Sequence, residues 1–261
     1  MKYFTKEWYE LCQRTSFHLP LEEEKKAETF SEDYFQQLYN NELNSWITLQ
    51  EEIALILKTN ETANIDENTN YEPFNRDKAI EQFHLSFINN QEYLKKELSE
   101  PILNQIADIR VYALYKASRN VINAVTQFCE KNEKDVTMTS KDYRRYINGA
   151  SASLGEEIIK NFSFHDCTII KSVKNERSLK LLLDNTGGFT NIDEVIFENV
   201  TIIQQDGLLQ GSWWLYEEIY KSNDKYEFRV LLQNITMGLI EFIISADQIL
   251  FKSNKDSNYN S

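Results

Sequence analysis

The sequence predicts an α+β protein, with a helical N-terminal region followed by an antiparallel β-sheet or small barrel of about six strands. The first 148 residues contain no glycine, and all seven glycines lie between Gly149 and Gly238. All three prolines lie between Pro20 and Pro101. Near Asn161 the spacing of apolar residues changes from about 3.6, which is typical of helices, to two, which is typical of strands. These observations predict two regions that are built differently.

Helix N-caps and helical spacing of apolar residues define the front region. Asn89-Asn90 is a candidate break within the third helix, and Gly149 a candidate bend in the last. A polar stretch from Thr59 to Asn75 predicts a surface loop. The expected helices run from Lys6 to about Arg14 after a Thr5 cap, from Ser31 through Leu57, from Asp77 through Leu94, from a Ser99 cap to about Glu130, and from Ser140 through Ile158.

Short runs rich in Val, Ile, Phe, Tyr and Trp define the back region, and turn-like segments separate them. No spacing supports β-α-β units. The expected strands are Phe162–Val173, Leu179–Asp184, Val195–Ile203, Ser212–Tyr220, Tyr226–Gln233 and Leu239–Ile244. The domains predicted from these patterns are a helical region over 1–160, an antiparallel β domain over 161–252 and a disordered tail over 253–261.

The net charge of −13 limits the classes of partner. An acidic surface repels phosphate backbones, so we expect no nucleic-acid binding. The same charge would speed association with a basic protein, although it also serves solubility alone. No stretch approaches the roughly 20 apolar residues that a membrane span needs. Three widely spaced cysteines without a CxxC pair, and a start without an apolar run, predict a reduced, cytoplasmic protein.

His165-Asp166-Cys167 is the densest group of reactive side chains. On a strand, His165 and Cys167 would share one face and Asp166 would lie on the other. Their Cβ atoms would then be roughly 7 Å apart, because each residue rises about 3.3 Å, and a thiolate–imidazole pair needs hydrogen-bond contact. The structural alternative is an edge strand whose Asp166 binds nearby backbone amides.

Trp213 to Tyr220 form an unusual strand, because both faces carry large aromatic or aliphatic groups. One interpretation is packing on both sides, with the helical region covering one face. The other is an exposed strip of Trp214, Tyr216 and Tyr220 that binds a protein or ligand, since Trp and Tyr are enriched at binding hot spots.

The register of the following hairpin determines the surroundings of Glu217 and Glu218. A three-residue loop sets Glu217 opposite Arg229, whereas a two-residue loop pairs Glu218 with Arg229 and leaves Glu217 inward. In either case one carboxylate shares a face with apolar groups, and its pKa could be raised as in a general acid.

Recognisable catalytic and cofactor motifs are missing from the sequence. There is no HExxH, GxSxG, P-loop or calcium loop, and the one Glu-x-x-His match, Glu81 to His84, has no second copy. We therefore expect no cofactor and no metal.

Four segments carry a resemblance to a known family: Met1 to Tyr9, Phe164 to Cys167, Thr186 to Phe189 and Trp213 to Glu218. With them the chain resembles an uncharacterised family of Bacillus-type bacteria, domain-of-unknown-function family 4085, over nearly its whole length. The resemblance implies no activity and no catalytic residues. The Phe-His-Asp segment before a small β domain is also similar to some bacterial immunity-type proteins.

The leading functional hypothesis is a non-enzymatic cytoplasmic protein that binds another protein, with immunity-like neutralisation of a basic toxin as its sharper form. One alternative is an enzyme using Glu217 or Glu218, His165 and Asp166 in a site between the two regions. Another is a small-molecule sensor. The sequence leaves the oligomeric state open.

Overall fold

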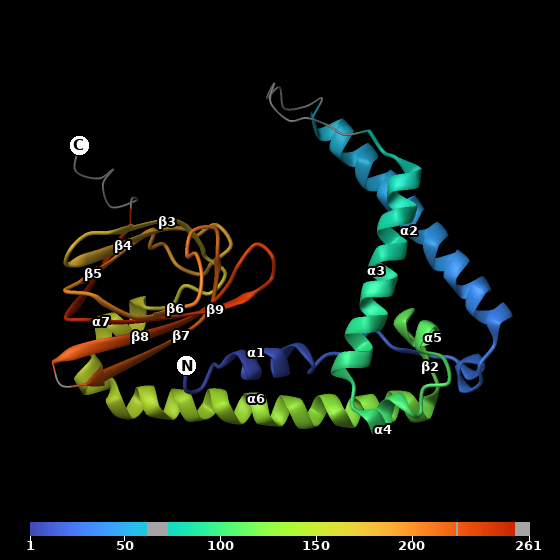
Figure 1. The fold of residues 1–261 in the computed structure, drawn as a ribbon, viewed down its shortest axis with the longest axis horizontal. Helices are drawn as coiled ribbons and strands as arrows, with labels where there is room; N and C mark the ends of the chain where they lie inside the picture. Colours follow the sequence, from blue (N-terminus) through green and yellow to red (C-terminus); the bar gives the residue numbers. More distant parts are fainter. Residues whose placement is uncertain (62–72, 223, 254–261) are drawn as a thin grey trace. The chain divides into compact units, whose positions relative to one another are not determined.

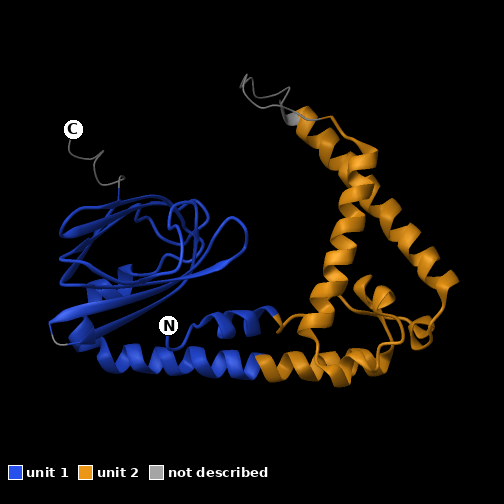
Figure 2. Cartoon of the chain, in the orientation of Figure 1, with its two compact units in different colours: residues 1–13, 133–261 blue, residues 14–132 orange. Residues whose placement is uncertain are grey.

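A computed structural model describes residues 1–61, 73–222 and 224–253. The chain divides into two compact units: unit 1 comprises residues 1–13 and 133–261, and unit 2 comprises Arg14–Asn132 (Figure 2). The boundaries between the units, after Gln13 and after Asn132, therefore do not coincide with the change from helices to strands near Asn161. Residues 62–72 of the predicted surface loop and 254–261 of the predicted tail lie outside the described residues.

Unit 2 is built around a hairpin of two long helices, α2 (Glu32–Glu61) and α3 (Arg76–Glu97). The Ser31 hydroxyl accepts from the Tyr34 amide at the start of α2, as its N-cap position predicts. The helices run antiparallel, since Phe35 stacks on Phe87 near one end and Trp46 donates to the Ala79 carbonyl farther along. The remaining elements are η1 (Lys25–Glu28), α4 (Glu100–Leu103), α5 (Ile109–Ala113) and a parallel pair, β1 (Glu22–Glu23) with β2 (Lys116–Ala117).

The helix boundaries differ from the prediction in three places. α3 is continuous through Asn89-Asn90, and the side-chain amide of Asn90 donates to the Ala113 carbonyl rather than to the backbone of its own helix. The predicted run from Ser99 to Glu130 is broken into α4, α5 and the start of α6 (Arg119–Leu154), with Tyr115 at a positive φ of 63°. The expected gap before Ser140 does not exist, since α6 passes through it (Figure 1).

Unit 1 contains an eight-stranded antiparallel sheet, which confirms the α+β prediction. The strands are β3 (Thr168–Lys174), β4 (Ser178–Asp184), β5 (Glu194–Glu198), β6 (Thr201–Gln205), β7 (Trp213–Ser222), β8 (Lys225–Gln233), β9 (Leu239–Ala246) and β10 (Gln248–Lys252). Their order is β10-β5-β4-β3-β7-β8-β9-β6. The sheet is open, since no pairing among the described residues joins β10 to β6.

The count of eight strands corrects the predicted six. The expected strand Val195–Ile203 is two strands, because Asn199 adopts a φ of 49° and turns the chain. β10 was missed because only Asp247 separates it from β9, so the apolar run ends without a visible turn signal. The expected strand Phe162–Val173 begins later, at Thr168, after the short helix α7 (Glu156–Asn161) and an irregular segment.

Both faces of the β7–β8–β9 part of the sheet are covered. The inner face forms the core of unit 1 with residues such as Trp214, Phe228 and Phe242, all fully buried. The outer face is covered within the same unit by α1 (Lys6–Gln13) and the second half of α6. Ring contacts of Phe4 and Trp8 with Tyr216, and of Tyr146 with Tyr220, form this second layer.

The strand register gathers four connecting segments at one end of the folded sheet. Thr168 at the start of β3 pairs with Asp184 at the end of β4 and with Trp213 at the start of β7, and Trp213 also pairs with Gln233 at the end of β8. Three of them are the loops between β4 and β5, β6 and β7, and β8 and β9, and the fourth is the segment that precedes β3. We call these residues 162–167, 185–193, 206–212 and 234–238 the loop end. The short turns, including the one between Ser222 and Lys225, lie at the opposite end.

Candidate functional site

His165-Asp166-Cys167 forms a turn rather than part of a strand, which corrects the same-face geometry expected from the sequence. Asp166 has a φ of 67°, and its amide donates to the Trp214 carbonyl at 2.9 Å. Nδ1 of His165 lies 2.9 Å from a carboxylate oxygen of Asp166. Both side chains are partly exposed, so the pair lies at the surface of the loop end.

The Cys167 thiol is an element of the core rather than a nucleophile. Its side chain is fully buried, and burial raises its pKa to about 11. A reactive thiol needs a lowered pKa and access to solvent, and Cys167 has neither. Gly187 and Gly188 pack directly against this turn: a Cβ on Gly188 would lie 2.5 Å from Sγ of Cys167. This close approach explains the Thr-Gly-Gly sequence of the β4–β5 loop.

The β7–β8 hairpin adopts the register of the two-residue loop. Ser222 pairs with Lys225, Glu218 with Arg229 and Ile219 with Phe228. The two adjacent glutamates therefore lie on opposite faces of the sheet, with Glu217 on the inner face and Glu218 on the outer. The four residues of the acid/base hypothesis are thus not gathered in one site.

Glu218 is fully buried and binds the N-terminal segment. Its carboxylate accepts from the backbone amides of Lys2 at 2.8 Å and of Tyr3 and Phe4 at 2.7 Å each. The Tyr220 hydroxyl donates to it at 2.7 Å. Burial, followed by this hydrogen bond, raises the pKa of Tyr220. All of these groups belong to the protein, so Glu218 positions residues 2–4 against the sheet.

Glu217, on the inner face, is a carboxyl group whose pKa is raised. Its side chain accepts from Nε1 of Trp214 at 2.7 Å. Burial raises the pKa of Glu217 to about 7, although hydrogen bonds from Trp214, the Phe164 amide and Ser163, and the charge of His165, oppose the shift. A carboxyl group with this pKa can exchange protons near neutrality.

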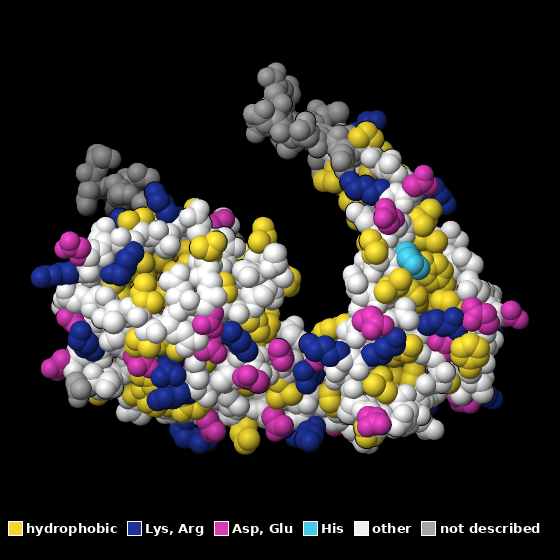
Figure 3. Space-filling model, in the orientation of Figure 1, with side chains coloured by type: hydrophobic (Ala, Val, Ile, Leu, Met, Phe, Trp, Pro, Cys, Tyr) yellow, Lys and Arg dark blue, Asp and Glu magenta, His cyan; other side chains and the backbone are white. Residues whose placement is uncertain are grey.

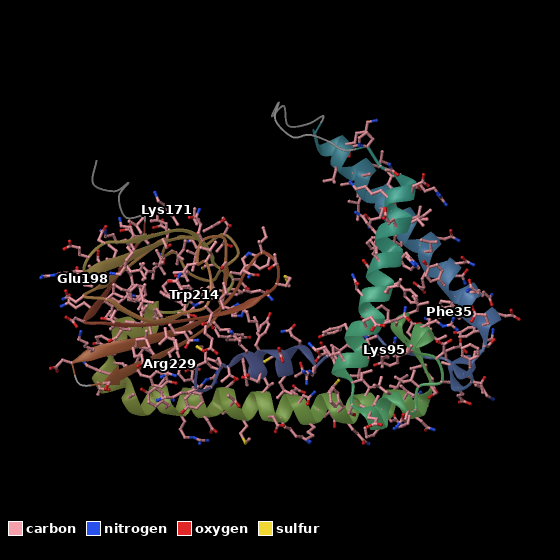
Figure 4. The ribbon with its side chains drawn as sticks, viewed as in Figure 1. Phe35, Lys95, Lys171, Glu198, Trp214 and Arg229 are labelled. Carbon is pink, nitrogen blue, oxygen red and sulfur yellow. The ribbon has the colours of Figure 1, made fainter. Side chains whose placement is uncertain are left out.

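The predicted strip of Trp214, Tyr216 and Tyr220 does not lie exposed along β7. Trp214 is enclosed in the core of unit 1 (Figure 4), and Tyr220 is buried under the outer layer. Tyr216 is half-buried, with the rings of Trp8 and His165 against it. The physical reason is that both faces of β7 are covered, which was the structural alternative considered for this strand.

Exposed apolar side chains instead gather at the loop end. Four side chains on its three loops are between 62% and 93% exposed, and they are Phe189, Leu208, Ile235 and Met237. Trp213, the first residue of β7, adds a partly exposed ring. These residues were not predicted as a binding surface. The signal in the sequence was a large apolar residue in a turn-like segment rich in Gly, Asn and Thr, where an apolar side chain is not needed for a strand or helix to pack. Hydrophobic atoms reach the surface of the sheet unit in Figure 3.

The loop end carries acidic side chains, and its one basic side chain is His165, which pairs with Asp166. Its four segments contain Asp166, Asp193 and Asp206 and no lysine or arginine. One cation from α1 approaches, since Nζ of Lys6 lies 3.1 Å from a carboxylate oxygen of Asp206. The loop end therefore combines protruding apolar groups with negative charge.

Two classes of site find no support in the described part of the chain. Over residues 1–61, 73–222 and 224–253, no three His, Cys, Asp or Glu side chains are grouped as a metal site would require. No helix within those ranges is both long and apolar enough to cross a membrane.

The comparison with known families agrees with the resemblance seen in the sequence. The family described as "Protein of unknown function (DUF4085)" matches residues 50–244, which is most of the chain. The chain therefore belongs to this family. No curated protein and no solved structure matches it.

Proposed function

We propose that this member of the DUF4085 family is a non-enzymatic protein that binds another protein through the loop end of unit 1. One observation carries the proposal: Phe189, Leu208, Ile235 and Met237, from three separate loops, all protrude at the same end of the sheet. Leaving large apolar side chains in water gives the free protein no stability, whereas their burial in a complex is favourable. Loops held by a rigid sheet are common recognition surfaces.

The charge of the loop end indicates the kind of partner. Its aspartates lie beside the apolar groups, so the best partner surface has apolar side chains flanked by lysine or arginine. The net charge of −13 would speed association with such a partner and oppose binding of nucleic acid. Immunity-like neutralisation of a basic toxin is the sharper form of this proposal. A cytoplasmic location belongs to it as well, and it is consistent with three cysteines that form no disulfide bond with one another.

The experiment places a photo-crosslinking amino acid at Phe189 or at Ile235 in the native host. Glu176, an exposed residue in a turn at the opposite end of the sheet, serves as the matched control. We expect the same basic protein to be captured from both loop positions and not from Glu176. Equal capture from Glu176, or capture of unrelated proteins at the two loop positions, would contradict the proposal.

A second step measures affinity with the purified partner. The double variant Phe189→Asp/Ile235→Asp should bind at least roughly thirtyfold more weakly, because a single hot-spot residue is worth about 2 kcal/mol. Raising the salt concentration should weaken binding by a smaller factor, mainly through slower association. Unchanged affinity of the double variant would place the interface elsewhere.

Acid/base catalysis is a second candidate function, and the raised pKa of Glu217 is the observation that favours it. This version of the catalytic hypothesis involves only Glu217 and His165, because Glu218 binds the N-terminal segment on the other face of the sheet. A substrate screen with the wild-type chain and Glu217→Gln tests it. Any turnover that is lost in the variant would favour an enzyme.

A further inference from the structure

The loop between β8 and β9, residues 234–238, carries two strongly exposed apolar side chains. Ile235 is 85% exposed and Met237 is 62% exposed. The loop joins two long strands of the sheet and projects beyond them (Figure 1). Neither side chain therefore contributes much to the core of unit 1, and their surroundings in the loop indicate what they do instead.

The side chain of Asn234 holds this loop in one conformation. Its Oδ1 accepts hydrogen bonds from the Thr236 amide at 3.0 Å, the Thr236 hydroxyl at 2.9 Å and the Gly238 amide at 2.7 Å. The backbone of Asn234 makes two more, since its amide donates to the Gly238 carbonyl and its carbonyl accepts from the Met237 amide, both at 2.9 Å. A five-residue loop with these internal bonds has little backbone freedom left to lose.

Met237 is fixed in a conformation that a free chain rarely adopts. Its φ is 64°, in the left-handed region that residues other than glycine and asparagine seldom populate. Its carbonyl accepts from the side-chain amide of the buried Gln233 at 3.3 Å, which ties the loop to the end of β8. Strained residues of this kind are concentrated at ligand-binding sites, where the surrounding structure holds them in place.

The exposure of the apolar side chains indicates the shape of the surface that covers them. A strongly exposed side chain has few neighbours in its own protein, so a flat partner surface would cover its tip and leave its sides in water. A concave apolar pocket covers all sides and gains the full burial energy of the side chain. Phe189 and Leu208 protrude in the same way from the other two loops of the loop end.

A membrane surface also buries apolar loop tips, but the charges of the loop end oppose it. Membrane-binding elements carry lysine or arginine beside their apolar groups, whereas the four segments of the loop end contain three aspartates and no lysine or arginine. Lys6 approaches from α1, but it is paired with Asp206. A second copy that met this surface with its own loop end would bring the same aspartates together. These charges favour a different protein.

We propose, building on the function proposed above, that the β8–β9 loop is a preformed loop that inserts into a concave apolar pocket of the partner protein, with Ile235 and Met237 at its tip. Asn234 is the positioning residue, because it holds both apolar side chains in their bound arrangement before the partner arrives. A loop that is ordered in advance loses less conformational entropy on binding. A ligand pocket or an active-site cleft is the kind of surface that such a loop fits and blocks.

Affinity measurements on Asn234 variants test the positioning role, with the protein captured from both Phe189 and Ile235 as the probe. Asn234→Ala removes the shared acceptor and should weaken binding at least roughly tenfold, because the freed loop must be ordered again on binding. Asn234→Asp keeps an acceptor oxygen and should restore most of the affinity. Asn175→Ala is the matched control. Asn175 lies in the turn between β3 and β4, at the opposite end of the sheet, so this variant should bind as the wild type does.

Two further measurements separate positioning from folding. In the free Asn234→Ala variant, the amides of Thr236 and Gly238 should lose protection from hydrogen exchange, while the amides of the core strands change little. Photo-crosslinking amino acids at Ile235 and at Met237 of the otherwise wild-type chain should both attach to residues that line one pocket of the partner. This mapping does not depend on the Asn234 variants, so it tests the proposal even if Asn234→Ala fails to fold.

Four results would overturn the proposal. Two of them, unchanged affinity of Asn234→Ala and cross-links spread over a flat surface of the partner, would leave the proposed function of the loop end intact. The other two identify a different occupant: cross-linking of Ile235 to another copy of this chain, or binding to vesicles of phosphatidylethanolamine and phosphatidylglycerol that Ile235→Asp abolishes. Failure of Phe189 and Ile235 to capture a common protein would overturn both the insertion and the proposed function.

Discussion

Glu218→Gln is expected to destabilise unit 1 through the N-terminal segment. The carboxylate accepts four hydrogen bonds, three from the backbone amides of Lys2, Tyr3 and Phe4 and one from the Tyr220 hydroxyl. An amide side chain can retain about three of these four hydrogen bonds. Each retained bond is weaker by about 1 kcal/mol, because a hydrogen bond to a neutral group contributes about that much less than one to a charged group. The free energy of unfolding should therefore fall by about 3 kcal/mol. The melting temperature of unit 1 should then fall by about 6–12 °C.

Hydrogen exchange tests the physical reason directly. The amide protons of Tyr3 and Phe4 should lose protection in Glu218→Gln, because their acceptor is weakened, while amides in the core strands change much less. Glu227→Gln is the matched control on the same face of the sheet. It removes a partly exposed ion pair with Arg229 and should cost at most about 1 kcal/mol. Equal melting temperatures for the two variants, or unchanged protection of residues 3 and 4, would refute the reasoning.

Three further predictions concern a pKa, a close contact and the loop end. Burial raises the pKa of Glu217 to about 7, so the folded protein favours the protonated carboxyl group. The stability that this preference contributes is fully present below the pKa of Glu217 in the unfolded chain and is lost as the pH rises through 7. Calorimetry from pH 5 to 8 should therefore show a loss of roughly 3 kcal/mol in the wild type that Glu217→Gln lacks. Gly188→Ala should cost about 1–3 kcal/mol in urea titrations, because its Cβ would lie 2.5 Å from Sγ of Cys167, whereas Gly149→Ala in α6, with nothing within 4 Å, should be neutral or stabilising. Phe189→Asp should change the urea midpoint very little, about 0.5 kcal/mol or less in stability, because the ring is exposed; a large loss would mean that this ring packs in the free protein.

The sequence predicted the elements whose signals are local. The Thr5 and Ser31 caps lie where expected, because a capping side chain and its amide are three residues apart. The sequence also contained the caps that divide the long predicted helix. Asp108 accepts from the Arg110 amide before α5, and Ser118 accepts from the Val121 amide before α6. The regular apolar spacing from Ile102 to Phe128 concealed both.

The remaining differences arise from contacts between residues distant in the sequence. Trp214 is buried because the rest of the sheet and Phe162 and Phe164 close over the inner face of β7, whereas residues 1–13 and α6 cover the outer face. The spacing within β7 cannot show this. Glu218 illustrates the same limit, since the three backbone amides that it binds are more than 200 residues earlier in the chain. The sequence narrowed the hairpin to two registers, but only the observed pairing of Glu218 with Arg229 decides between them.

The composition of unit 1 from residues 1–13 and 133–261 has a consequence for synthesis on the ribosome. Unit 2 is continuous in sequence, so its nascent polypeptide can complete its own core while the strands are still untranslated. Residues 2–4, by contrast, leave the exit tunnel early and must wait until Glu218 has been made. During translation the aromatic side chains of Phe4 and Trp8 therefore stay without their partner Tyr216 until β7 has been made.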